Sequence, residues 1–150
     1  MLALALTSCS SSTQAAAPTT PSSSEAPTAT ETSSTVAEVA NAVAELRPKI
    51  TENFDEFRTN RCSGVLSSGQ TGIDAATCVG NQIALGSYAK ALNITLESLK
   101  PWPSEIESLT QQTTERLKTV ASTSEMDDSR MFDTAVLLLN SKLQGWDPYL

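Results

Sequence analysis

The chain changes character near residue 35, where the spacing of its apolar side chains becomes regular. Residues 10–35 consist mainly of Ser, Thr, Ala and Pro and contain no large apolar side chain. Beyond them, apolar positions recur three and four residues apart, which is the spacing of one face of an α-helix. This pattern predicts a helical domain over residues 36–150. The stretch before it buries too little apolar surface to offset the entropy of ordering it.

The first expected helix covers residues 36–60. Its apolar stripe consists of Val36, Val39, Val43, Leu46, Ile50, Phe54 and Phe57. Thr35 and Glu38 have the spacing of a capping box, in which each side chain bonds the backbone N–H of the other residue. Pro48 removes a backbone donor inside this helix, so we expect a kink or a break near residue 47.

The second expected helix covers residues 74–99, with Thr71 or Asp74 as its N-cap and Pro101 beyond its end. Beside its large apolar residues lies a stripe of small ones, formed by Gly80, Ala84, Ser87 and Ala91. Small side chains allow a neighbouring helix to pack closely, and they also leave room for a partner helix or a ligand.

Two further helices are expected before the C-terminus. Ser104 and Glu107 repeat the capping-box spacing before the third helix, and Ser124 is the expected cap of the fourth. Gly145 is expected to end the fourth helix in a left-handed conformation.

These four amphipathic segments, with no strand pattern between them, predict an all-α domain. The connections at residues 100–103 and 123–124 are short, which favours antiparallel neighbours and an up-down-up-down four-helix bundle. If Pro48 breaks the first helix, the alternative is a run of three helices plus a separate kinked arm.

The N-terminal residues Leu6-Thr7-Ser8-Cys9 follow a short apolar run. A leucine three residues before a cysteine, with a small residue directly before that cysteine, resembles the lipobox of bacterial lipoproteins. The resemblance implies that residues 1–8 are a signal peptide and that Cys9 becomes the first mature residue, carrying lipid such as palmitate on its sulfur. No basic residue precedes Cys9 and the apolar run is shorter than the usual 7–15 residues, so we expect a truncated signal. The alternative is a stray apolar patch beside an accidental cysteine.

Residues 9–35 are then a lipidated cysteine followed by a disordered tether. Their Ser/Thr/Pro/Ala composition is similar to the stalks of lipoproteins from high-GC Gram-positive bacteria, which can carry O-linked sugar. Together, the lipobox and the stalk imply a protein anchored by lipid to the extracytoplasmic face of the cell membrane.

With Cys9 assigned to lipid, two cysteines remain, Cys62 and Cys78. An even remainder in an exported protein predicts a disulfide bond, which would hold a Gly-rich loop at the end of a helical hairpin. A redox-active or metal-binding pair is the weaker alternative, because CxxC spacing and histidine are both missing. Within this loop, residues 64–71 have the spacing of a phosphate loop except that Gln70 stands in place of the lysine, so we expect no nucleotide site.

Composition narrows the possible functions further. A net charge of −7 makes nucleic acid and anionic lipid surfaces unlikely partners. The chain has no His and no spare Cys, so we expect neither catalysis nor a cofactor nor a metal site. Glu38, Glu45 and Glu52 form a row along the first helix, which we interpret as a solvated flank.

Two functions are consistent with this sequence. One is a non-catalytic interaction module, in which a lipid-anchored bundle presents a helix face or the disulfide loop to an envelope protein. The other is a carrier or sensor that binds a small apolar ligand between its helices. A cavity of about 300 Å³ or more would favour the carrier, whereas a packed core would leave only surfaces for binding.

Overall fold

The computed structural model describes residues 33–150, and all regular structure within them is helical. The elements are α1 (Val36–Thr59), α2 (Cys62–Ser67), α3 (Ile73–Ser98), α4 (Glu107–Thr123), α5 (Ser129–Gln144) and the 3₁₀-helix η1 (Asp147–Tyr149). The predicted all-α class and helical bundle are therefore confirmed. The predicted signal peptide, Cys9 and residues 10–32 lie outside the described residues.

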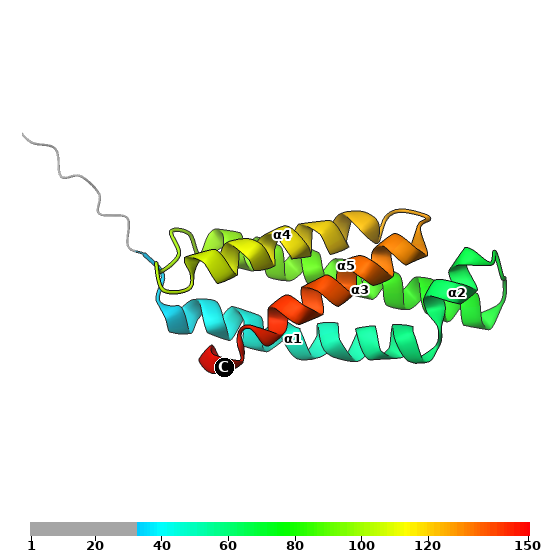
Figure 1. Ribbon diagram of the computed structural model, residues 1–150, viewed down its shortest axis with the longest axis horizontal. Helices are drawn as coiled ribbons and strands as arrows, with labels where there is room; N and C mark the ends of the chain where they lie inside the picture. The colour runs from blue at the N-terminus through cyan, green and yellow to red at the C-terminus, as the bar shows by residue number, and fades with distance from the viewer. Residues whose placement is uncertain (1–32) are drawn as a thin grey trace, which may run out of the picture. The chain divides into compact units, whose positions relative to one another are not determined.

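The four long helices, α1, α3, α4 and α5, pack along the length of the bundle (Figure 1). Consecutive long helices contact one another, and α2 contacts α1, α3 and α5. We call the end that contains α2 and the connection between α4 and α5 the distal end. The opposite end, where α1 begins beside the connection between α3 and α4, is the proximal end.

Hydrogen bonds fix the start of α1 at the proximal end. The Ser33 hydroxyl and the Ser34 backbone N–H both donate to the Pro101 carbonyl, at 2.9 and 3.2 Å. The predicted capping box is confirmed, because Glu38 N–H donates to Thr35 Oγ1 at 3.2 Å and Thr35 N–H donates to Glu38 Oε2 at 2.7 Å. The bonds from the backbone and hydroxyl of Thr35 hold the pKa of Glu38 below its ordinary value.

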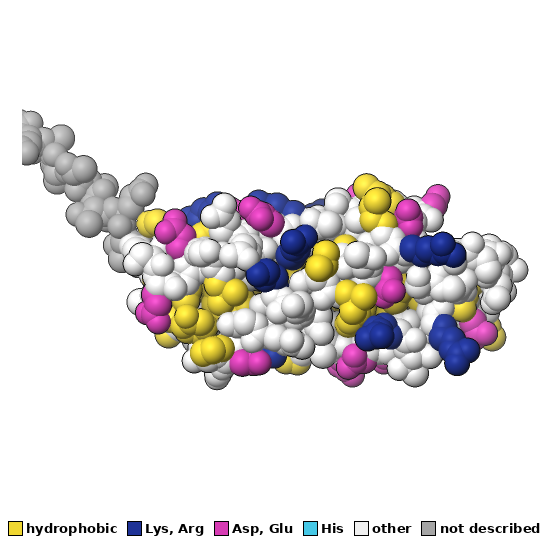
Figure 2. Space-filling view, in the orientation of Figure 1, with side chains coloured by type: hydrophobic (Ala, Val, Ile, Leu, Met, Phe, Trp, Pro, Cys, Tyr) yellow, Lys and Arg dark blue, Asp and Glu magenta, His cyan; other side chains and the backbone are white. Residues whose placement is uncertain are grey.

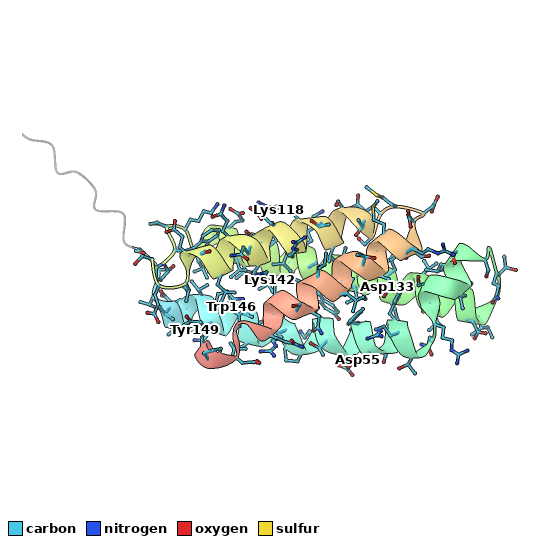
Figure 3. All side chains as sticks on the ribbon, viewed as in Figure 1. Asp55, Lys118, Asp133, Lys142, Trp146 and Tyr149 are labelled. Atoms are coloured by element: carbon cyan, nitrogen blue, oxygen red, sulfur yellow. A yellow bond between two sulfur atoms is a disulfide. The ribbon has the colours of Figure 1, made fainter. Side chains whose placement is uncertain are left out.

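The core is built from the apolar stripes of the long helices. Phe57 and Phe132 meet edge to face with ring centroids 5.4 Å apart. The fully buried Trp146 donates its indole N–H to Thr113 Oγ1 at 3.1 Å, so both polar groups are satisfied inside the core. Trp146 also packs against Tyr149 at the C-terminal end, beside α1 (Figure 3).

Pro48 does not break the first helix, and α1 continues from Val36 to Thr59. The proline lies on the exposed side of α1, while Val43 and Ile50 on either side of it are buried in the core. Packing of this face holds the helix together across the missing backbone donor. The alternative of three helices with a separate arm is therefore wrong.

The segment between the two cysteines contains more helix than the sequence predicted. Its first part forms α2, and Val65 and Leu66 of this helix pack against the core. The helix that follows begins at Ile73 with Gly72 at the N-cap, so neither Thr71 nor Asp74 is its cap. Gly72 has a φ of 114°, a conformation that is open to glycine and strained for other residues.

Two further predicted N-caps are wrong, and one predicted C-terminal end is right in position but not in conformation. Ile106, with no capping side chain, stands at the N-cap of α4 in place of Ser104. Asp128 caps α5, accepting from the N–H groups of Arg130 and Met131, whereas Ser124 ends α4. Gly145 ends α5 as predicted, but its conformation is right-handed, with φ −62° and ψ −14°, because the chain turns directly into the 3₁₀-helix.

The close approach expected from small residues on the second helix occurs at a different position. Gly80, Ser87 and Ala91 are exposed and Ala84 is half-buried. The residue that permits close packing is Gly86, which is buried against Ser124 at the end of α4. A Cβ atom at Gly86 would overlap the Ser124 side chain, whereas a Cβ at Gly80 would have open space around it.

This difference predicts opposite effects for the same substitution. Gly86→Ala should lower the free energy of unfolding by about 1–3 kcal/mol, because the Ser124 side chain is too close to accommodate a methyl group. Gly80→Ala should raise it by about 0.5–1 kcal/mol, because alanine loses less backbone entropy in a helix. Urea denaturation of both variants measures the two changes, and a stabilised Gly86→Ala protein would contradict the packing described here.

Candidate functional site

A groove at the distal end is the strongest candidate for a binding site. It has a volume of about 520 Å³ and lies between α2, α3 and the α4–α5 connection. Its apolar lining is provided by Leu66 of α2, Val79 and Ile83 of α3, and Met126 of the connection. We call this feature the distal groove.

The distal groove leaves large apolar side chains in contact with solvent. Val79, Ile83 and Met126 are 46%, 58% and 47% exposed. Single exposed apolar residues are common, but a group of them around one hollow is typical of an interaction surface. In Figure 2, hydrophobic and acidic side chains lie together over the α4–α5 connection.

The wall formed by α2 is fixed to the rest of the bundle by two bonds. The disulfide between Cys62 and Cys78 joins α2 to α3, and both cysteines are fully buried. The buried Ser129 hydroxyl, at the start of α5, donates to the Ser63 carbonyl of α2 at 3.0 Å. The predicted pairing of Cys62 with Cys78 is thus confirmed, and its structural consequence is to hold Leu66 beside the groove.

The wall formed by the α4–α5 connection is held by Gln82. Its side-chain amide donates to the carbonyls of Ser124 and Met126, at 3.0 and 3.3 Å. Gln82 is 9% exposed and lies on the buried face of α3 with Cys78 and Leu85. Sequence reasoning missed this residue, although a glutamine placed on the apolar face of a helix is a signal that a buried polar partner is required.

A second groove follows the outer face of α1 and has a volume of about 1170 Å³. It is wide and shallow, and its lining includes Arg47, Glu52 and Asp55. The carboxylate of Asp147 pairs with Arg47 at 2.6 Å near its edge. Mixed charges on an open helix face, such as Asp55 in Figure 3, are ordinary for a surface helix. This groove is larger, but most of the side chains that line it are charged or polar, whereas large apolar side chains from three elements line the distal groove.

A third groove, of about 840 Å³, lies at the proximal end beside Trp102. Glu97 bonds Lys100 at 2.6 Å and Lys118 at 2.8 Å, and hydrogen bonds from these two lysines hold the pKa of Glu97 below its ordinary value. The Lys100 ammonium also lies 4.5 Å from the centre of the Trp102 ring. The basic groups here are thus engaged within the protein.

The structure does not bring the row of glutamates on α1 together with other ligands. Glu38, Glu45 and Glu52 are all exposed. Within residues 33–150 there is no group of three His, Cys, Asp or Glu side chains placed to hold a metal ion. In the same residues, no helix combines the length and the apolar character needed to cross a membrane.

Comparison of the chain with models of protein families, with curated proteins and with solved structures found no match.

The disulfide predicts a measurable loss of stability when it is removed. Replacing both Cys62 and Cys78 with Ser should lower the free energy of unfolding by about 3 kcal/mol, because the bond closes a loop with a sequence separation of 16. Hydrogen exchange should become faster in residues 62–67, since α2 then loses its link to α3. Unchanged denaturation and exchange would show that the disulfide does not hold the wall of the groove.

Proposed function

We propose that this protein is a bacterial lipoprotein whose helical bundle is a non-catalytic interaction module for another envelope protein. The observation that carries the proposal is the distal groove, where exposed apolar side chains surround a hollow whose walls are fixed by a disulfide and by Gln82. Walls fixed before binding reduce the entropy lost when a partner is bound.

The proposed anchor is lipid on Cys9, on the extracytoplasmic face of the cell membrane. The sequence supports it through the likeness of residues 6–9 to a lipobox, and through the Ser/Thr-rich composition of residues 10–35. As a flexible coil, a tether over residues 10–35 would span about 28 Å. It joins the bundle at the proximal end, and the 24 residues of α1 extend about 36 Å from there toward the distal end. The groove is thus far from the point where the chain joins the bundle.

The up-down-up-down arrangement of the four long helices belongs to the same proposal. It is supported by the short connections at residues 99–106 and 124–128, and by the contacts between consecutive long helices. In such a bundle each connection lies at one end, so the α4–α5 connection can form a wall of the groove.

A carrier or sensor of a small apolar ligand is the second candidate. The observation that favours it is the volume of the distal groove, which lies within the usual range for small-molecule sites. The groove is open at the surface, however, and the space between the helices is filled by fully buried side chains such as Leu85, Leu117 and Leu139. Native mass spectrometry of the full chain distinguishes the two, because a carried ligand adds mass that disappears on denaturation.

The anchor makes a prediction about location. Cys9→Ala should move the protein from the membrane fraction to the soluble fraction of the native host, because no sulfur remains to carry the lipid. Circular dichroism of the released protein should show a helical fold, since the first helix of the bundle begins at Val36. Continued membrane retention of the variant would contradict the proposed anchor.

The interaction module predicts that capture of a partner depends on the distal groove. With a photo-crosslinking amino acid at position 126, Ile83→Asp should lower the yield of adduct with an envelope protein by about tenfold or more, because it places a charge in the apolar lining of the groove. Ile94→Asp is the matched control, since Ile94 lies on the same helix and is 59% exposed, against 58% for Ile83. Equal capture by both variants would remove the groove from the proposal.

A further inference from the structure

We infer that the distal groove recognises a protein segment in which apolar side chains are flanked by lysine or arginine. The inference rests on the proposed function and deepens it, because it names the chemistry of the partner at the same groove. Its basis is the combination of an apolar lining and an acidic edge in the distal groove.

The charged residues that line the distal groove are both acidic. They are Glu125 and Asp127, on the α4–α5 connection beside Met126. Within residues 33–150 neither carboxylate takes part in an ion pair, although Glu97 and Asp147 elsewhere on the surface do. Two carboxylates next to exposed apolar side chains are suited to a cation that arrives with a bound partner.

Neither Arg130 nor Lys90 forms an ion pair with this acidic edge. Arg130 lies in the first turn of α5, and its side chain does not line the groove. Lys90 lines a smaller depression that shares Ile83 and Glu125 with the groove, and it does not line the groove itself. The carboxylate of Asp128 accepts two backbone N–H groups as the cap of α5 and is thereby engaged within the protein.

The fixed position of Glu125 and Asp127 strengthens the argument. The two Gln82 hydrogen bonds hold the carbonyls on either side of Glu125, so the backbone that carries the acidic edge is tied to α3. Charges on a fixed backbone select a partner better than charges on a mobile loop, because less entropy is lost when each ion pair forms.

Other occupants fit this chemistry less well. A neutral apolar molecule would cover the groove and leave both carboxylates partly desolvated without a partner. A second copy of this chain in a symmetric contact would bring the same two carboxylates against themselves. Nucleic acid and anionic lipid would meet charge of the same sign. A protein segment with both apolar and basic side chains can contact the apolar lining and also pair with the two carboxylates.

The test uses the full-length protein in its native host, with a photo-crosslinking amino acid at position 126. Mass spectrometry of the adduct should identify a segment with apolar residues flanked by Lys or Arg. A double variant that carries Glu125→Lys and Asp127→Lys should give about fivefold less of this adduct. This is the combined effect expected from the loss of two exposed ion pairs. Replacing the flanking Lys or Arg of the captured segment with Glu should restore the yield in that variant.

The matched control is Glu45→Lys with Glu105→Lys, which changes the net charge by the same amount at exposed positions that do not line the distal groove. Its yield should stay within about twofold of the unmodified protein, because screening limits the effect of distant charges. An equal loss in both double variants would show a general charge effect and overturn the inference.

The outcomes separate this inference from the proposed function. A captured segment without flanking Lys or Arg, or one whose capture the charge reversal does not change, would overturn the partner chemistry and leave the interaction module standing. Absence of any adduct from position 126, or equal capture from position 45 on α1, would overturn both. An extra mass seen by native mass spectrometry and lost with Ile83→Asp would replace the protein partner with a small ligand.

Discussion

The buried disulfide between Cys62 and Cys78 determines what the distal end of the bundle can be. A six-residue helix such as α2 is too short to be stable alone, because the first turn of a helix costs more entropy than its hydrogen bonds return. The covalent link to α3, the Ser129–Ser63 hydrogen bond and the packing of Leu66 together hold it in place. Without these contacts the groove would have no wall on the side of α2, and Val79 and Ile83 would be two exposed residues on the surface of α3 with no hollow beside them.

The opposite wall depends on polar atoms buried at a helix–helix contact. Gly86 lets the end of α4 approach α3 closely, and Gln82, one turn earlier, then reaches two carbonyls of the following connection. Thr110 and Thr113 of α4 are also buried, and each hydroxyl donates to the backbone carbonyl four residues earlier at 2.8 Å. Hydroxyl groups satisfied within the helix can be buried at little cost, which allows a helix with few large apolar residues to pack on both of its neighbours.

The parts of the fold that follow from periodic burial could be predicted from sequence. The stripe from Val39 to Phe57 and the pairing of the two cysteines both depend on patterns carried by the chain itself. Helix ends were less predictable, because several residues compete to cap one helix. Ser124 has the right side chain, yet the turn that allows Gln82 to bond the connection extends to Asp128 before α5 begins. The groove could not be predicted, because it forms only where α2, α3 and the α4–α5 connection come together in space. In the sequence, only Gln82 indicates such a contact, since a glutamine on the buried face of a helix requires a polar partner.

The distal groove and the point where the proposed tether joins the bundle lie at opposite ends of α1, so the proposed anchor could also affect how strongly the groove binds. The distal groove has few apolar side chains and two acidic ones, which alone would support only a modest affinity. If Cys9 carries lipid, the tether confines the groove to a thin layer above the membrane, and a partner in the same membrane meets it at an effective concentration of about the millimolar range. A weak contact is then sufficient for binding, and the same contact would be largely empty for a protein free in solution. Because α1 separates the groove from the proximal end, the lipid and the partner can be bound at once.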